Sequence, residues 1–317
     1  MNTRTDMKKR NGIELLRGLS ITGIVLYHLT PKLCPGGFLG VLLFFVLSGY
    51  LMYVTCENEW RKGTFHIVHF YRKRLLKIIP PLFFMVMVIC SYLTITKNSC
   101  MAGIWKELCS IFLGFDNWWQ IGKHASYFSR LAAASPFTHL WFLAVEMQFY
   151  LLWPFLFVLY KRSSEHIGGE KMCFLFLGLA FLSAGKMFIL YHTGDDPSRV
   201  YYGTDTMSFS LFIGSFLGAY RQEYFSKRKS RNGVFLFCSL FTACLFLFVK
   251  GEAPFLYKGG MFFISLFFAA FLHLTESKEE AENKDFQFFF LSLLGKNSYS
   301  IYLWHYPLIF LTLPGAS

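Results

Sequence analysis

Glu146 is an ionisable residue in a stretch of sequence that is otherwise apolar and aromatic. It lies within "HLWFLAVEMQFYLLWPFL", residues 139–156. A carboxylate at the centre of a membrane helix costs about 2.5–3.5 kcal/mol or more. His139 precedes Glu146 by seven residues and Tyr150 follows it by four, so a helix would place all three on one face. A carboxylate this deep needs a cationic partner, and its presence indicates a functional position.

The first apolar stretch, "NGIELLRGLSITGIVLYHL", carries Glu14, Arg17 and His28. A helical rise of 1.5 Å per residue separates Arg17 from His28 by roughly 16 Å. An imidazole is suited to act as a general base near neutral pH. Two plainer interpretations stay open, because an arginine near the cytoplasmic face can extend to the lipid headgroups and a histidine can simply pack.

Further polar residues mark the third and the last apolar stretches. In "FYRKRLLKIIPP", Arg74 and Lys77 are three residues apart and project from one helix face. They could hold a phosphorylated cofactor, although position alone favours ordinary basic anchoring at the membrane surface. In "NSYSIYLWHYPL", His305 lies between two aromatic residues and fits either a polar path or an aromatic belt.

Together these residues predict a polar path through a helical bundle. Basic residues would line its cytoplasmic mouth, a carboxylate its interior and a histidine its outer half. A cation-rich inner mouth suits an anionic cytosolic ligand. The 8 cysteines are scattered without a Cys-x-x-Cys pair, so we expect no metal site.

The elements that must position this path are membrane helices. Of the 317 residues, 54% are hydrophobic and 16% charged, against about 25% charged in soluble domains. In lipid, helices satisfy every backbone polar group internally. We expect an all-α, polytopic transmembrane bundle of about nine to ten spans, forming one domain over residues 1–317. The expected spans lie near 12–30, 38–56, 75–96, 138–160, 172–192, 205–220, 234–250, 258–274 and 288–314, with a re-entrant or interfacial piece near 101–115.

The distribution of positive charge predicts the orientation. With the N-terminus inside, the inner segments hold 20 Lys and Arg residues and the outer segments hold 8. This asymmetry follows the positive-inside rule and places the N-terminus in the cytoplasm. The net charge of +12 is therefore spread over cytoplasmic loops, and we expect no nucleic-acid partner. No repeat is visible, which argues mildly against transporters built from detectable repeats.

Six segments in order resemble the acyltransferase-3 family of bacterial integral-membrane acyltransferases, many of which O-acetylate extracytoplasmic glycans. They are "IELLRGLSITGIVLYH", "GVLLFFVLSGYLM", "RKRLLKIIP", "HLWFLAVEMQFYLLWP", "YYGTDTMSFSLFIG" and "NSYSIYLWHYPL". The resemblance implies that His28 is the general base and that Glu146 is the glutamate of the "ExQFY" motif. The residues expected to engage acyl-CoA are Arg17, Arg72, Arg74 and Lys77. The other expected pore or substrate residues are Glu14, His139, Gln148, Tyr150 and His305.

The chain departs from the family pattern at several positions. Lys77 replaces a second arginine, which keeps the charge but loses the planar fork. Met147 stands where a second glutamate is common, and Met207 where an arginine is common. The chain ends soon after "LWHYPL", where relatives continue through one more span. No SGNH-type esterase domain is recognisable, so we expect no relay through such a domain within this chain.

The resemblance implies a multi-pass enzyme of the bacterial inner membrane. It would transfer an acyl group, typically acetyl, from cytosolic acetyl-CoA to a hydroxyl of an extracytoplasmic or lipid-linked glycan. The alternative from another class is a transporter or flippase of a lipid-linked saccharide, which would use the same polar path for passage. Acyl-CoA hydrolysis that depends on His28 would separate the two.

Overall fold

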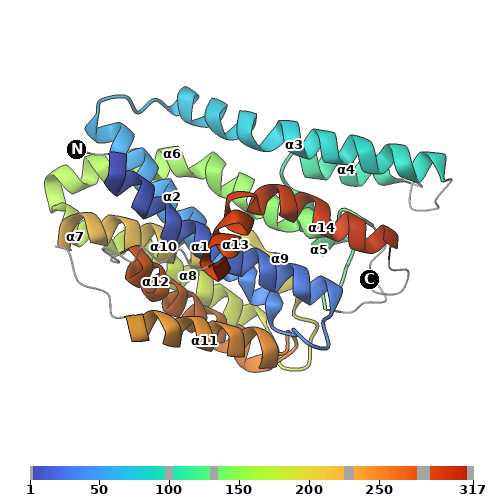
Figure 1. The fold of residues 1–317 in the computed structure, drawn as a ribbon. Coiled ribbons are helices and arrows are strands. Elements are labelled where there is room, and N and C mark those ends of the chain that lie inside the picture. Colours follow the sequence, from blue (N-terminus) through green and yellow to red (C-terminus); the bar gives the residue numbers. More distant parts are fainter. Residues whose placement is uncertain (1–2, 97–102, 129–134, 225–231, 277–285, 313–317) are drawn as a thin grey trace.

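The computed structural model describes residues 3–96, 103–128, 135–224, 232–276 and 286–312, and every regular element in these ranges is helical (Figure 1). The first half of the chain contains α1 (Thr3–Leu29), η1 (Gly37–Leu39), α2 (Gly40–Arg61), α3 (Ile67–Ile95), α4 (Ile104–Phe112), α5 (Asp116–Gly122), η4 (Thr138–Leu140) and α6 (Trp141–Ile167). The second half contains α7 (Gly169–Met172), α8 (Phe174–Leu190), α9 (Ser198–Tyr202), α10 (Thr204–Tyr224), α11 (Asn232–Phe248), η5 (Leu256–Gly260), α12 (Met261–Glu276), α13 (Phe286–Lys296) and α14 (Ser298–Thr312). The predicted all-α class is confirmed.

Five helical segments in the described ranges are long and apolar enough to cross a bilayer. They are Gly37–Arg61, Ile67–Ile95, Thr138–Ile167, Gly169–Leu190 and Leu256–Thr275, with a shorter apolar helix at Gly233–Phe248. They make the chain a multi-pass membrane protein. The helices α1 and α10 have 27 and 21 residues and so exceed the roughly 20 residues that span the hydrocarbon layer, but they carry more polar residues. The number of spans stays a prediction.

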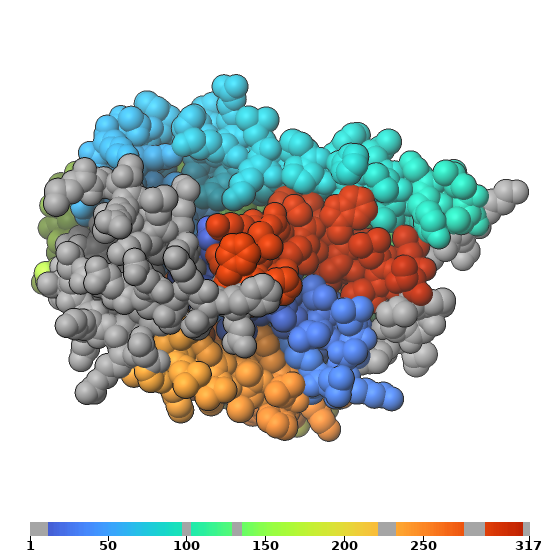
Figure 2. All heavy atoms as spheres, viewed as in Figure 1, coloured from blue at the N-terminus to red at the C-terminus, as the bar shows by residue number. Residues whose placement is uncertain are grey.

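The long helices pack with α2 near the centre and α3 at the periphery. In the apolar window of α2, 83% of the residues are buried, against 33% in that of α3. The exposed face of α3 carries large apolar side chains such as Phe83 and Phe84, as expected for contact with lipid. The space-filling view shows α3, α14 and α1 lying side by side along one face (Figure 2).

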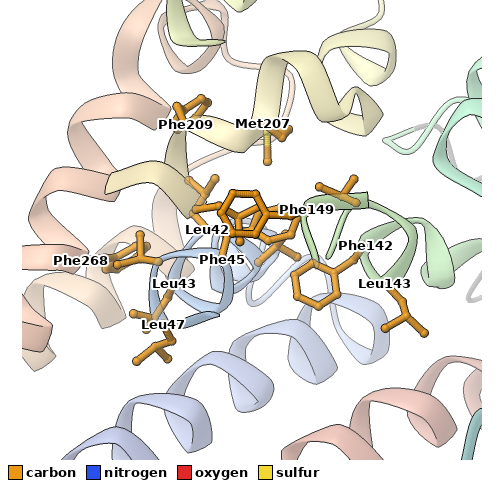
Figure 3. Close-up of a cluster of buried hydrophobic side chains, with 14 of the residues drawn as sticks. Leu42, Leu43, Phe45, Leu47, Phe142, Leu143, Phe149, Met207, Phe209 and Phe268 are labelled. Atoms are coloured by element: carbon orange, nitrogen blue, oxygen red, sulfur yellow. The ribbon is translucent and has the colours of Figure 1, made fainter. Parts of the chain in front are cut away.

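A dense apolar cluster joins α2 to α6, α10 and α12 (Figure 3). Leu42 and Phe45 of α2, Phe149 of α6 and Met207 of α10 all contribute to it. Met207 has no exposed surface. The position where the family commonly has an arginine is therefore filled by an apolar side chain in the core.

Two segments refine the sequence-based expectations. The last expected span, 288–314, is two helices, because α13 ends at Lys296 and α14 begins at Ser298. The α13 backbone lies directly against α1, where a Cβ added at Gly295 would be 1.7 Å from the carbonyl oxygen of Glu14. By contrast, α14 contacts α3 as well as α1. The piece near 101–115 forms α4, whose 9 residues are too short to span.

Candidate active site

A cavity of about 390 Å³ lies among α1, α2, α3, α6 and α14, within the roughly 300–1,000 Å³ usual for small-molecule sites. Its charged lining residues are Glu14, Arg17, Arg74, Lys77 and Glu146. The sequence predicted each of them as a site residue, and three helices far apart in the chain, α1, α3 and α6, bring them together. Three cations against two carboxylates leave a net positive lining, which suits an anionic ligand.

Glu146 projects from α6 into this cavity and is only 9% exposed. Its Oε1 accepts a hydrogen bond from the hydroxyl of Ser48 on α2. Among the described residues, none of the ion pairs within 4.0 Å includes Glu146. Its charge instead interacts across the cavity with three cations, those of Arg17, Arg74 and Lys77. The direct partner is thus a hydroxyl, where the sequence suggested a cation.

Arg74 is held by two cation–π contacts and one contact with a sulfur atom, and it forms no ion pair with another described residue. Its guanidinium lies 5.2 Å from the ring centroid of Tyr150 and 5.6 Å from that of Phe70. One nitrogen is 3.5 Å from the sulfur of Met52. Cation–π contacts of this kind orient a guanidinium without occupying its hydrogen-bonding edge. Tyr150 therefore lines the cavity, as predicted, and helps to hold Arg74.

The remaining predicted cations differ in placement. Within the described part of the chain, Arg17 lines the cavity and forms neither a hydrogen bond nor an ion pair. Lys77 also lines it. Arg72 is exposed on α3 and is absent from the lining. Glu14 is tied to α13 through the Ser292 hydroxyl, which donates to its Oε2 at 3.0 Å.

Three imidazoles from three elements lie close together outside the cavity lining. His28 of α1 and His305 of α14 have ring centroids 5.3 Å apart, and His139 of η4 is 5.4 Å from His305. Tyr302 connects this cluster to the cavity, because it lines the cavity and its hydroxyl donates a hydrogen bond to the His139 carbonyl. Phe142 packs on Tyr302 at 5.3 Å and lines the cavity beside it.

Sequence reasoning did not single out Ser48 or Tyr302. Tyr302 precedes His305 by three residues on α14, so helical spacing places the two on one side. That spacing could have identified it. Ser48 lies in an apolar run with no charged neighbour, and its role follows only from the packing of α2 against α6.

Gln148 does not join the cavity. Its amide nitrogen donates to the Gly114 carbonyl and to Asn117 Oδ1, both at 2.8 Å, and its amide oxygen accepts from the Trp118 indole at 3.1 Å. Successive helical residues turn by about 100°, so a residue two positions from Glu146 faces nearly the opposite way. Gln148 therefore anchors α5 to α6.

Metal ligation finds no support in the part of the chain that the structure describes. No group of three or more His, Cys, Asp or Glu side chains there is arranged to hold an ion.

Comparison with known proteins agrees with the resemblance seen in the sequence. A family model described as "Acyltransferase domain", of the acyltransferase-3 type, matches residues 10–314. The peptidoglycan O-acetyltransferase OatA of Listeria monocytogenes is 36% identical over 98% of this chain and 51% of its own length. The O-acetyltransferase OatA of Staphylococcus aureus is 32% identical over 94% of this chain and 50% of its own length. The chain thus spans about half the length of these curated relatives. No solved structure shows significant similarity to it.

Proposed function

Because the chain belongs to the acyltransferase-3 family, we propose that it transfers an acetyl group from acetyl-CoA to a hydroxyl of an extracytoplasmic glycan. The name of the Listeria relative favours peptidoglycan as that glycan. The observation that carries the proposal is the net positive cavity, whose lining residue Tyr302 packs against His139 and His305 of the histidine cluster. It offers an anion-binding region and a base-bearing region along one path.

The orientation is part of the proposal. The N-terminus lies in the cytoplasm of a bacterial cell and the chain crosses the inner membrane. The excess of Lys and Arg in the predicted inner segments, 20 against 8, supports this. The N-terminus of α1, the end of α2 and the start of α3 gather at one end of the bundle in Figure 1, as the orientation requires.

Acetyl-CoA would be held at its phosphate groups by cations, and its thioester end would extend into the helical bundle. Arg17, Arg74 and Lys77 would bind the phosphate groups of the nucleotide, because all three line the cavity and none of them forms an ion pair with another described residue. The pantetheine arm then extends toward Tyr302 with the thioester at its tip. Along α1, roughly 16 Å separate Arg17 from His28, a span that an extended arm could cover.

His28 would be the general base. It takes the proton of the acceptor hydroxyl while the hydroxyl oxygen attacks the thioester carbonyl. A C–O bond forms, the C–S bond breaks, and the departing thiolate receives a proton. Base catalysis of this kind contributes typically 10²–10⁴-fold in rate.

The test is acetyl transfer by the purified protein in proteoliposomes, from acetyl-CoA to a soluble peptidoglycan fragment. His28→Ala should lose transfer by about 10²–10⁴-fold, and His28→Gln should not restore it, because an amide cannot take the proton. His192→Ala is the matched control, since the His192 side chain is 77% exposed. Transfer at the wild-type rate by His28→Ala would exclude His28 as the base. A protein that never cleaves acetyl-CoA but moves saccharide across the vesicle would instead be a transporter.

A further inference from the structure

The charged cavity extends along the helices that line it, and its two ends differ in chemistry. On α6 its first lining residue is Phe142 and its last is Tyr150, eight positions further on. A helical rise of 1.5 Å per residue separates them by roughly 12 Å. Tyr150 lies at the cationic end, because its ring centroid is 5.2 Å from the guanidinium of Arg74. Phe142 therefore marks the opposite end.

Three aromatic rings from three helices meet at that opposite end. Phe44 is the first residue of α2 that lines the cavity, and Tyr302 is the last residue of α14 that does so. The ring centroid of Phe142 is 6.0 Å from that of Phe44 and 5.3 Å from that of Tyr302. We call these three residues the aromatic end. It presents apolar surface to a ligand whose anionic part the cations attract.

Residues behind the aromatic end hold its rings in place. Phe142 stacks on Phe45, with 4.6 Å between the ring centroids and 27° between the ring planes, and Phe45 has no exposed surface. Tyr302 is tied through its hydroxyl, which donates a hydrogen bond to the His139 carbonyl. Close-packed side chains of this kind cannot move back without strain. The packing therefore limits how far a ligand can extend in this direction.

We propose that the aromatic end is the acyl pocket of the enzyme and that Phe142 limits the acyl chain to acetyl. The inference rests on the proposed transfer from acyl-CoA. When cations hold the phosphate groups of the donor, its acyl group is the opposite tip and reaches the three rings. Burial of the acetyl methyl group there is favourable, whereas each further methylene has to displace a packed ring. One methylene changes the rate in a hydrophobic pocket by about 10–200-fold.

Two substitutions should enlarge this pocket. Phe142→Ala removes its ring and leaves space that a propionyl or butyryl chain can fill. Phe44 is only half-buried, so Phe44→Ala opens the same end with a smaller loss of stability. It decides the question if Phe142→Ala does not fold.

The matched control is Phe149→Ala on the same helix. Phe149 is buried in the apolar cluster of Figure 3 and is not among the described residues that line the cavity. This variant therefore loses the same ring from the core without changing the acyl pocket.

The measurement is kcat/KM for acetyl-, propionyl- and butyryl-CoA in proteoliposomes, with a soluble peptidoglycan fragment as acceptor. We expect the wild type to prefer acetyl-CoA over propionyl-CoA by about 10–200-fold. Phe142→Ala and Phe44→Ala should each reduce this preference at least about tenfold, because the added methylene then has space. Phe149→Ala should keep the wild-type preference.

A second measurement does not depend on turnover. At equal concentrations, butyryl-CoA should raise the thermal midpoint of Phe142→Ala more than acetyl-CoA does. The order should be reversed in the wild type, because the ligand that binds more tightly stabilises the folded protein more.

Several outcomes would overturn the inference. Equal kcat/KM for acetyl-CoA and butyryl-CoA in the wild type would show that the pocket sets no length limit. An unchanged preference in folded, active Phe142→Ala and Phe44→Ala proteins would place the acyl group elsewhere. An equal loss of preference in Phe149→Ala would assign the effect to general loosening of the bundle. A wild-type protein that transfers no acyl group from any of the three donors would instead refute the proposed function, and this inference with it.

Discussion

Ser48 of α2 donates a hydrogen bond to the buried carboxylate of Glu146 on α6, across 98 positions of sequence. The contact joins the central helix of the bundle to the helix that carries the most conspicuous charge in the sequence. Three cations line the same cavity without touching that carboxylate. Glu146 is therefore positioned by a hydroxyl and balanced by cations at a distance, which leaves those cations free for a ligand.

Replacing Glu146 tests this balance. Glu146→Gln keeps the shape but removes the negative charge, which leaves the three cations of Arg17, Arg74 and Lys77 around the cavity without it. We expect acetyl transfer to fall at least about tenfold and the thermal midpoint in detergent to drop, because the cations then repel one another with no carboxylate at Glu146 to offset them. Ser48→Ala should have a smaller effect of about 1–3 kcal/mol, the loss of one hydrogen bond to a buried charged group. A fully active Glu146→Gln protein of normal stability would show the carboxylate to be dispensable.

Arg72 and Arg74 lie two residues apart on α3 and can be compared directly. Arg74 lines the cavity, whereas Arg72 is exposed and does not. Arg74→Ala should raise KM for acetyl-CoA by about 10–100-fold, the usual value of a hydrogen bond to a charged group. Arg74→Lys should raise it less, because the charge remains.

The control for that comparison is Arg72→Ala, which should leave KM for acetyl-CoA near the wild-type value. The measurement is initial rate against acetyl-CoA concentration at saturating acceptor. Equal KM values for Arg74→Ala and Arg72→Ala would mean that the basic residues at the start of α3 only anchor the helix at the membrane surface.

Asp116 gives the stability of the protein a predictable pH dependence. It lies in the short helix α5, outside the spanning helices, and has no exposed surface. Burial, with the nearby Glu107 carboxyl adding to it, raises the pKa of Asp116 from 3.8 to about 8. Between these values the folded protein holds a proton that the unfolded chain releases, so stability should fall as pH rises from about 4 to 8.

Asp116→Asn should remove this contribution. Its thermal midpoint in detergent, relative to wild type, should rise steadily from pH 5 to pH 8, because only the wild type must take up a proton at this position on folding, which becomes less favourable as pH rises. Asp195→Asn, whose side chain is 65% exposed, serves as the control and should run parallel to wild type. A constant difference between Asp116→Asn and wild type across this range would contradict the assignment.

Much of the fold could be predicted from the sequence because membrane helices are long and apolar. The approximate spans follow from runs of Leu, Phe, Ile and Val, and the shared face of Glu146 and Tyr150 follows from helical spacing. The break between α13 and α14 was missed because "LLGKNSYS" is short and flanked by apolar residues on both sides. Nothing in such a run says where a helix must turn to meet α1.

The site was predicted less completely, for a physical reason. A sequence shows which residues are costly in lipid, so Arg17, His28 and Glu146 stand out. It does not show which uncharged residue on another helix will face them, and Ser48 and Tyr302 are residues of this kind. Gln148 could have been placed outside the cavity from the sequence, because the two helical positions between it and Glu146 turn it to nearly the opposite face.

The last prediction concerns Gly49, the residue next to Ser48. Here α2 lies so close to α10 that a Cβ at Gly49 would be 1.9 Å from the carbonyl oxygen of Leu211, and one at Gly214 would be 2.0 Å from that of Val46. Backbone atoms cannot rotate away, so Gly49→Ala must push the two helices apart. Overpacking of this kind costs typically about 1–3 kcal/mol. The shift would also move the Ser48 hydroxyl relative to Glu146, so activity should fall with stability. The control is Gly178→Ala on α8, because a Cβ there meets nothing within 4 Å. This variant should be neutral or stabilising by up to about 1 kcal/mol. The thermal midpoints and acetyl-transfer rates of both variants, measured in the same detergent, test the prediction. Equal midpoints for Gly49→Ala and Gly178→Ala would mean that α2 and α10 tolerate separation and that their close approach is not required for the site.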